Sequence, residues 1–274
     1  MRPSLAGQLL RMTALVLLAG FALFPLVWMV SVSLMAPGEA SRFPPPLFPV
    51  APGLGAYRAL FATTGIAHYF LNSVIVATLA TLLSLVFNTA AGYAFAKLRF
   101  RGRDRFFQLL LAALVIPSQV TMLPLFLMLK ELGLINSFAG VLVPLVTSIF
   151  GIFLVRQYAL SIPDELLEAA RVDGAGEGRI FVQIVVPVLT PILITLALFT
   201  FLAAWNDFMW PLIVLSDQDR YTLPVALAAL SREHVQDNEM MMAGSVLTIL
   251  PVLVLFLVLQ RYYLQGLLAG SVKG

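Results

Sequence analysis

Long apolar stretches alternate with short polar ones along this chain. A helix that crosses a membrane needs about 20 mostly apolar residues at 1.5 Å rise each. Six stretches meet this length: residues 12–34, 72–96, 106–129, 138–155, 188–215 and 243–263. Prolines inside them are compatible with spanning helices, because neighbouring helices satisfy the freed carbonyl groups. The pattern predicts an all-α polytopic membrane protein, a single domain over residues 1–274 with six transmembrane helices.

The polar segment between the fourth and fifth stretches, residues 156–187, collects much of the charge of the chain. Beyond Arg156 at its start, its charged residues are Asp164, Glu165, Glu168, Arg171, Asp173, Glu177 and Arg179. Several of them recur at intervals of three and four, which predicts one polar helix face. The opposite, apolar face is predicted to carry Ile162, Leu166, Ala169 and Ala170.

Local signals predict two short helices in this segment. Ser161 followed by Asp164 has the spacing of a capping box, with Pro163 suited to the helix start. Asp173 and Gly174 form a helix stop, because glycine accepts the left-handed conformation that follows a C-cap. The second helix, residues 177–186, is amphipathic and continues into the fifth span.

The composition agrees with a membrane protein: 60% of the residues are hydrophobic, 11% are charged, and the mean hydropathy is +0.95. A soluble domain has about a quarter of its residues charged. The absence of cysteine excludes disulfides, thiolate metal sites and a cysteine nucleophile. The net charge of +3 suggests nucleic acid or anionic lipid as a partner, until the distribution of the charges is considered.

Lysine and arginine are distributed unevenly between the two sides of the predicted topology. One side holds Arg2, Arg11, Lys97, Arg99, Arg101, Arg103, Arg105, Arg156, Arg171, Arg179, Arg261 and Lys273, and the other holds Arg42, Arg58, Lys130, Arg220 and Arg232. By the positive-inside rule both termini are cytoplasmic. Topology alone explains the basic cluster at 97–105, so no nucleic-acid partner is expected. The first stretch is longer than the usual signal-peptide core, which favours a span over a cleaved signal.

Two predicted outer segments are long enough to have structure of their own. Residues 35–71 contain a proline-rich run at 43–49, which favours stiff, extended backbone. Residues 216–242 are acidic and polar. This second segment either meets a soluble partner outside the cell or is a plain connector.

Glu168-Ala169-Ala170, Gly174, Ile184 and Pro187 have the spacing of a known signature. They resemble the EAA-x3-G-x9-I-x-L-P motif of ABC importer permeases, with Val186 where leucine is usual. Further similarity to the smaller permease of carbohydrate-type importers is carried by Asn72-Ser73, Ala94-Phe95-Ala96, Arg99-Phe100-Arg101-Gly102, Pro163, Asp164-Glu165, Trp205-Asn206-Asp207-Phe208 and residues 270–274.

This resemblance implies a subunit of a larger assembly in the bacterial cytoplasmic (inner) membrane. The partners it implies are a second permease subunit, in a heterodimer, two ATP-binding subunits and an extracellular or periplasmic solute-binding protein. ATP is then bound by the partner, and this chain, which has no Gly-x4-Gly-Lys-Ser/Thr motif, binds no cofactor. The residues implied to contact the ATPase are Asp164, Glu165, Glu168, Ala169, Ala170, Asp173, Gly174, Ile184 and Pro187. The C-terminal tail is also implied to dock there.

Polar residues inside the predicted spans are candidates for a transport path. Asp207 lies in the fifth span beside Asn206 and near Trp205, and Asn88 lies in the second. Burying an unpaired ionisable residue in the membrane costs free energy, so such a residue is a candidate for a function. Amides and carboxylates can bond to the hydroxyl groups of a sugar, and aromatic rings can pack on its C–H side. The alternative for each of them is hydrogen bonding between helices. The sequence contains no catalytic or metal-ligating constellation.

These observations predict the permease subunit of an ATP-driven importer that moves a sugar or polyol by alternating access. The alternatives are a permease for amino acids, peptides or phosphate, and an ion-coupled secondary transporter. The last class usually has internal repeats and charge near the midplane, which this sequence lacks. A membrane enzyme has no candidate residues here.

Overall fold

The computed structural model describes residues 5–233 and 237–271, and within these ranges all regular structure is helical. The main helices are α1 (Leu5–Ser33), α2 (Gly55–Thr63), α3 (Ile66–Lys97), α4 (Arg103–Ala113), α5 (Ser118–Glu131), α6 (Phe138–Val146), α7 (Ile149–Ala159), α8 (Asp164–Val172), α9 (Glu177–Ile180), α10 (Val186–Trp205), α11 (Met209–Val214), α12 (Leu223–Glu233) and α13 (Asn238–Ser271). Contacts divide the chain into two compact units. One contains residues 5–67, 226–233 and 237–251, and the other contains residues 68–225 and 252–271.

Five helical segments in the described residues are long and apolar enough to cross a membrane: Gly7–Ser33, Ile66–Lys97, Phe138–Ala159, Glu177–Trp205 and Asn238–Val258. A sixth is obtained if α4 and α5 together form one broken span. The prediction of an all-helical protein with six apolar segments is therefore confirmed. Helices α3 and α7 continue beyond the predicted apolar stretches 72–96 and 138–155.

The third predicted span, residues 106–129, is not one straight helix. Helix α4 ends at Ala113, α5 begins at Ser118, and the two are bent by 105°. Pro117 precedes α5 in an extended conformation, with ψ of 134°. Proline has no N–H to donate and disfavours helical backbone at the residue before it, which explains the break. Pro124, by contrast, lies inside α5 and does not end it.

The fourth and fifth predicted spans also contain breaks. Residues 147 and 148 interrupt the fourth, and the Ser148 side chain accepts a hydrogen bond from the Gly151 backbone N–H to start α7. In the fifth, helix α10 ends at Trp205 and three residues separate it from α11. The prediction that residues 188–215 form one continuous helix is therefore wrong.

The first unit contains the proline-rich segment, which has no helix between residues 34 and 54. Glu39 is 3% exposed, and its carboxylate accepts hydrogen bonds from the backbone N–H groups of Ala36 (2.9 Å) and Val50 (2.8 Å). These bonds hold the pKa of Glu39 below its ordinary value. The carboxylate of Glu239, 1% exposed, accepts from the Ala40 N–H at 2.9 Å. Two buried carboxylates thus fasten a loop that has no helix or strand of its own.

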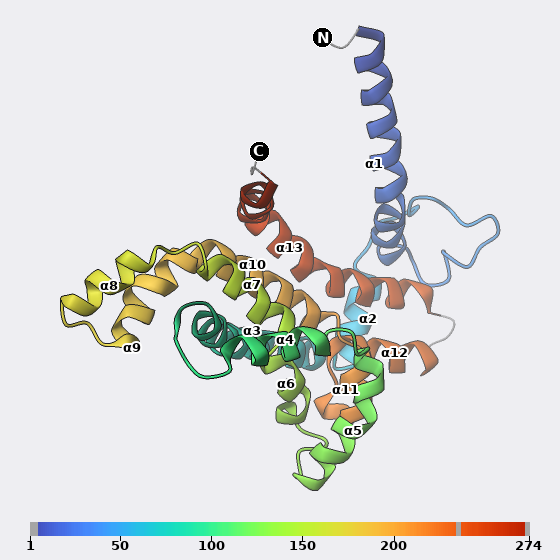
Figure 1. The fold of residues 1–274 in the computed structure, drawn as a ribbon. Coiled ribbons are helices and arrows are strands. Elements are labelled where there is room, and N and C mark those ends of the chain that lie inside the picture. The colour runs from blue at the N-terminus through green and yellow to red at the C-terminus, as the bar shows by residue number, and fades with distance from the viewer. Residues whose placement is uncertain (1–4, 234–236, 272–274) are drawn as a thin grey trace. The chain divides into compact units, whose positions relative to one another are not determined.

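In the second unit, an apolar cluster packs helices α3, α7 and α10 around the segment 160–185. Its buried members are Tyr93, Ala96, Val155, Ala159, Ile162, Leu167, Ile180, Val185, Leu189, Ile192 and Leu196. Gly92 permits the close approach of α3 to α7, since a Cβ at this position would lie 2.6 Å from the Cβ of Val155. In Figure 1 the yellow hairpin of α8 and α9 projects beyond the adjoining ends of α7 and α10.

Candidate functional site

The candidate site is the hairpin formed by α8, the turn at residues 173–176, and α9. Helix α8 ends in a Schellman motif. The Ala175 N–H donates to the Ala170 carbonyl (2.9 Å), the Gly174 N–H donates to the Arg171 carbonyl (3.0 Å), and Gly174 has a φ of +81°. The predicted helix stop is therefore confirmed. Helix α9 continues through a π-helical turn, Phe181–Val185, into α10 without a break.

The start of α8 differs from the prediction. No side chain caps the helix, and Pro163 occupies the N-cap position. The Ser161 hydroxyl instead donates to the Tyr158 carbonyl at 2.7 Å. Ser161 therefore satisfies a carbonyl at the end of α7, where such groups lack helical partners, and the predicted capping box is wrong.

The apolar side of the hairpin is attached to the cluster described above. Ile162, Leu167 and Ile180 are at most 3% exposed. The predicted apolar face is partly wrong, since Leu166 is 43% exposed and Ala169 is also exposed. Leu167, not Leu166, is buried in the apolar cluster with residues of α3 and α10. The buried face of α8 is therefore rotated by one residue from the predicted face.

A first clamp joins the start of α8 to the end of α3. The ammonium group of Lys97 donates to the Ile162 carbonyl (2.5 Å) and to the Asp164 carboxylate (2.7 Å). The Lys97 side chain is only 7% exposed, whereas that of Asp164 is 73% exposed. The hydrogen bond and the charge of Lys97 hold the pKa of Asp164 below its ordinary value. A largely buried lysine requires such partners, because an unpaired buried charge is costly.

A second clamp joins the other end of α8 to α9 and α3. The Arg171 guanidinium donates to the Glu177 carboxylate at 2.7 Å, and the Tyr93 hydroxyl donates to the same carboxylate at 3.3 Å. The bond to Glu177 raises the pKa of Arg171. Tyr93 and Lys97 lie one helical turn apart on α3. Both ends of α8 are thus tied to the same stretch of one apolar helix.

The outer side of α8 remains exposed. Its acidic residues Glu165, Glu168 and Asp173 are all accessible, as is Val172, at 87% exposure. Glu168 borders a groove that is also lined by Lys97, Arg99 and Arg103. Of the remaining residues predicted for this site, Ile184 is partly buried at the base of the hairpin and Pro187 is exposed at the start of α10. The surface combines acidic groups with small or apolar side chains on a rigidly held helix.

The residues predicted for a transport path occupy different environments in the structure. Asn88 is fully buried: its amide donates to the Ser84 hydroxyl (2.6 Å) and accepts from the Ser148 backbone N–H (3.0 Å). Trp205 is 1% exposed, and its ring packs edge to face on Phe70 of α3, with the ring centroids 5.5 Å apart. These two residues bridge elements within the protein.

Asn206 and Asp207 lie in the break between α10 and α11, not inside a helix as the sequence predicted. The exposed Asn206 amide donates to the Leu202 carbonyl at 2.9 Å. The half-buried Asp207 carboxylate accepts from the Trp210 N–H at 3.3 Å, at the start of α11. Residues that hydrogen-bond to local backbone favour helix ends over helix interiors, which explains why the helix ends here.

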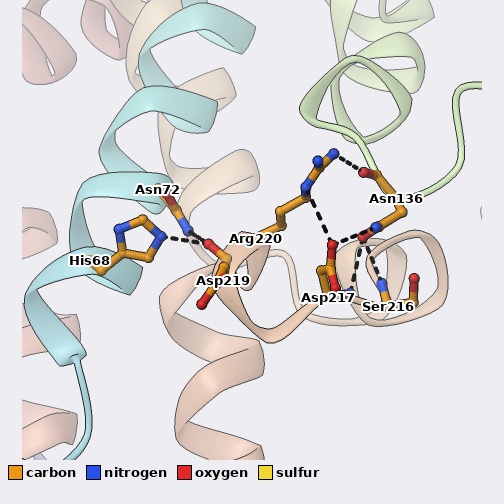
Figure 2. A network of polar contacts seen from close by, with 7 residues as sticks. All are labelled: His68, Asn72, Asn136, Ser216, Asp217, Asp219 and Arg220. Atoms are coloured by element: carbon orange, nitrogen blue, oxygen red, sulfur yellow. Dashed lines mark hydrogen bonds and ion pairs between the residues drawn. The ribbon is translucent and has the colours of Figure 1, made fainter.

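A polar network missing from the sequence prediction fastens the loop between α11 and α12, as Figure 2 shows. The Asn136 side chain accepts from the N–H groups of Ser216 (3.1 Å) and Asp217 (3.0 Å) and donates to the Asp217 carboxylate (3.0 Å). Arg220 donates to the Asn136 carbonyl. On the other side, His68 (2.6 Å) and Asn72 (2.9 Å) contact the Asp219 carbonyl.

Little in the sequence indicates this network, because its members are far apart in the chain. Asn136 has a positive φ of 57°, a conformation that asparagine tolerates better than most residues. Its partners lie about 80 residues away in the chain. His234, the other histidine, lies outside the described residues. Within the described ranges, no three His, Asp or Glu side chains come together to hold a metal ion.

Comparison with known proteins gives consistent matches over most of the chain. Residues 88–268 match the family described as "Binding-protein-dependent transport system inner membrane component". An arabinooligosaccharides transport system permease protein of Halalkalibacterium halodurans is 39% identical over 260 residues, which cover 94% of this chain and 93% of the relative. A lactose transport system permease protein of Rhizobium radiobacter is 33% identical, with 97% and 96% covered.

The fold is also similar to solved structures. A chain of a bacterial ABC transporter involved in the import of the acidic polysaccharide alginate superposes with a TM-score of 0.84. The two chains are 25% identical, and the match covers 96% of this chain and 99% of the other. A chain from the alginate transporter in complex with a pentasaccharide-bound periplasmic protein has a TM-score of 0.65 and 15% identity, with 92% of each chain covered.

Proposed function

The chain belongs to the family of binding-protein-dependent transport system inner membrane components, and we propose that it is the permease subunit of an ATP-driven importer of a sugar or polyol. The observation that carries this proposal is the clamped hairpin. Helix α8 presents an exposed acidic face, and α9 is continuous with the apolar helix α10. The named relatives that match nearly the whole chain transport carbohydrates, which supports the substrate class.

In this proposal α8 is the contact for a separate ATP-hydrolysing subunit. Glu168 is exposed on α8, where it can pair with a basic group of that partner. The small side chains of Ala169 and Ala170 permit a close approach. ATP is bound and hydrolysed on the partner, and this chain supplies no cofactor site.

The clamps determine how movement of α8 reaches the membrane helices. Because Lys97 and Tyr93 tie both ends of α8 to α3, and α9 is continuous with α10, displacement of α8 is transmitted to two membrane helices together. Closing of the ATPase pair would therefore move these helices and open the path to the other side of the membrane. In this proposal, alternating access results from the rigid connection of α8 to α3 and α10, and ATP hydrolysis takes place on the partner.

The assembly we propose contains a second permease subunit, two ATP-binding subunits and an extracellular or periplasmic solute-binding protein. Its location is the bacterial cytoplasmic membrane, with both termini in the cytoplasm. The excess of lysine and arginine on one side of the predicted topology supports this orientation.

Charge reversal at Glu168 tests the ATPase contact. We expect Glu168→Lys to lower uptake at least about tenfold, since it replaces an attractive charge pair with a repulsive one. The variant should remain in the membrane, because the side chain is exposed. Uptake, membrane abundance and co-purification of the ATP-binding subunits are measured together.

The matched control is Glu131→Lys, which reverses an exposed glutamate at the end of α5 on the opposite side of the predicted topology. It should leave co-purification unchanged. Normal uptake and normal co-purification in Glu168→Lys would show that α8 is not the contact.

A further inference from the structure

The turn between α3 and α4 concentrates positive charge around one glycine. Arg99, Arg101, Arg103 and Arg105 line an open pocket of about 870 Å³ together with Phe100, Gly102 and Asp104. Gly102 has a φ of +85°, and it is the N-cap residue of α4. Four arginines and one aspartate leave a net charge of +3 within seven residues.

Only some of these arginines are paired with hydrogen-bond acceptors among the described residues. Arg103 donates to the Asp104 carboxylate (3.1 Å) and to the Leu98 carbonyl (3.4 Å). The only acidic group in the turn is thereby paired with an arginine that is also anchored to the backbone. Arg101 and Arg105 are exposed and form no hydrogen bond or ion pair with the described residues. Their guanidinium groups are available to an external anion.

An exposed apolar strip begins directly beside these arginines. Phe106 is 58% exposed and Leu109 is 68% exposed, one turn apart on α4. Leu114 and Ile116, beyond the end of α4, are also exposed, while Phe107 on α4 is buried. Basic groups at one end of an accessible apolar strip match the two parts of a phospholipid, a charged headgroup and an acyl chain.

We propose that this turn binds the headgroup of an anionic phospholipid. The phosphate lies against the guanidinium groups of Arg101 and Arg105, and an acyl chain lies along Phe106 and Leu109. Arginine suits this role because its planar fork of N–H donors matches phosphate oxygens. The positive-inside rule accounts for the side of the membrane on which the turn lies, but it requires no bound lipid. A specific lipid site at this turn is a separate property.

Native mass spectrometry of the assembled, detergent-purified transporter tests this claim. Retention of phosphatidylglycerol is compared with that of phosphatidylcholine. Each arginine in contact with the headgroup phosphate contributes about a fivefold preference. We therefore expect Arg101→Gln/Arg105→Gln to lower the preference for phosphatidylglycerol about twentyfold. The control Arg11→Gln/Arg179→Gln, with the same change in net charge at exposed sites, should keep it.

Arg101→Lys/Arg105→Lys preserves the charge that insertion requires but removes the paired N–H donors. It should show an intermediate preference, and wild-type retention in this variant would overturn the assignment of the phosphate to these arginines. Unchanged retention in the glutamine variant would overturn the lipid site itself. Equal retention of phosphatidylglycerol and phosphatidylcholine by the unmodified transporter would also overturn it.

Discussion

At the scale of single residues, Lys97 is the best-defined contact of the candidate site. It is nearly buried, yet it is bonded to a main-chain carbonyl and to an exposed carboxylate at the same time. The two acceptors are not equivalent. If the lysine is removed, water can replace its bond to the exposed Asp164 carboxylate. The Ile162 carbonyl, which lies beside the apolar cluster, would be left without that hydrogen bond.

This asymmetry predicts unequal effects of substitution. Lys97→Met should lower uptake about tenfold, because an unsatisfied buried polar group is costly. Asp164→Asn should lower it less than about fivefold, because exposed ion pairs contribute little. The double variant should resemble Lys97→Met, since both changes affect one contact. Uptake per membrane-inserted copy is the measurement, and strictly additive effects would show that the two residues act separately.

Asp207 gives a second prediction at this scale. Asp207→Asn keeps an acceptor for the Trp210 N–H and removes the charge, while Asp207→Leu removes both. If the carboxylate only starts α11, the asparagine variant should be silent and the leucine variant should destabilise the helix by about 0.5–2 kcal/mol. We expect an intermediate loss of uptake for asparagine, up to about tenfold, with normal assembly. Wild-type uptake by both variants would remove Asp207 from the transport path.

At the scale of helices, the sequence predicted which segments cross the membrane but not where they break. Seven prolines lie inside the predicted spans, and the sequence does not distinguish those that break a helix from those that do not. Pro117 stands at a 105° bend, whereas Pro25 and Pro251 lie inside helices. Whether a proline breaks a helix depends on neighbours that satisfy the freed carbonyl groups, and those neighbours come from distant parts of the chain.

The hairpin shows the same division between local and distant information. Gly174 could be predicted to end α8, because a left-handed residue after a helix is a local requirement. The clamp between Lys97 and Asp164 joins residues 67 positions apart, and the burial of Leu167 in place of Leu166 depends on the angle at which α8 packs. Neither follows from spacing in the sequence.

The turn at Gly174 can be tested with a matched pair of glycines. Gly174→Ala forces a side chain into the left-handed region and should destabilise the turn by about 1–2 kcal/mol. Gly176 has a φ of −71°. A Cβ at either position meets no atom within 4 Å, so Gly176→Ala should be nearly neutral. Hydrogen exchange of the amides at the end of α8 measures the difference, and equal exchange in the two variants would contradict the strained-turn argument.

At the scale of the whole molecule, large apolar side chains remain exposed along the spanning helices. On α1, the consecutive residues Leu15, Val16, Leu17 and Leu18 are each more than 60% exposed. A soluble protein rarely exposes such a surface, whereas lipid or a partner permease covers it at no cost. The sequence predicted this property from composition, but it did not predict which faces of the helices are exposed.

Orientation in the membrane decides whether the hairpin can reach a cytoplasmic ATPase. The chain contains no cysteine, so single cysteines can be introduced without background. Gln218 in the outer loop and Val172 on α8 are both exposed. Gln218→Cys should react with an impermeant thiol reagent added outside intact cells, and Val172→Cys should react only after the cells are opened. The reverse pattern would place α8 outside, and both the ATPase contact and the proposed direction of energy transfer would then be wrong.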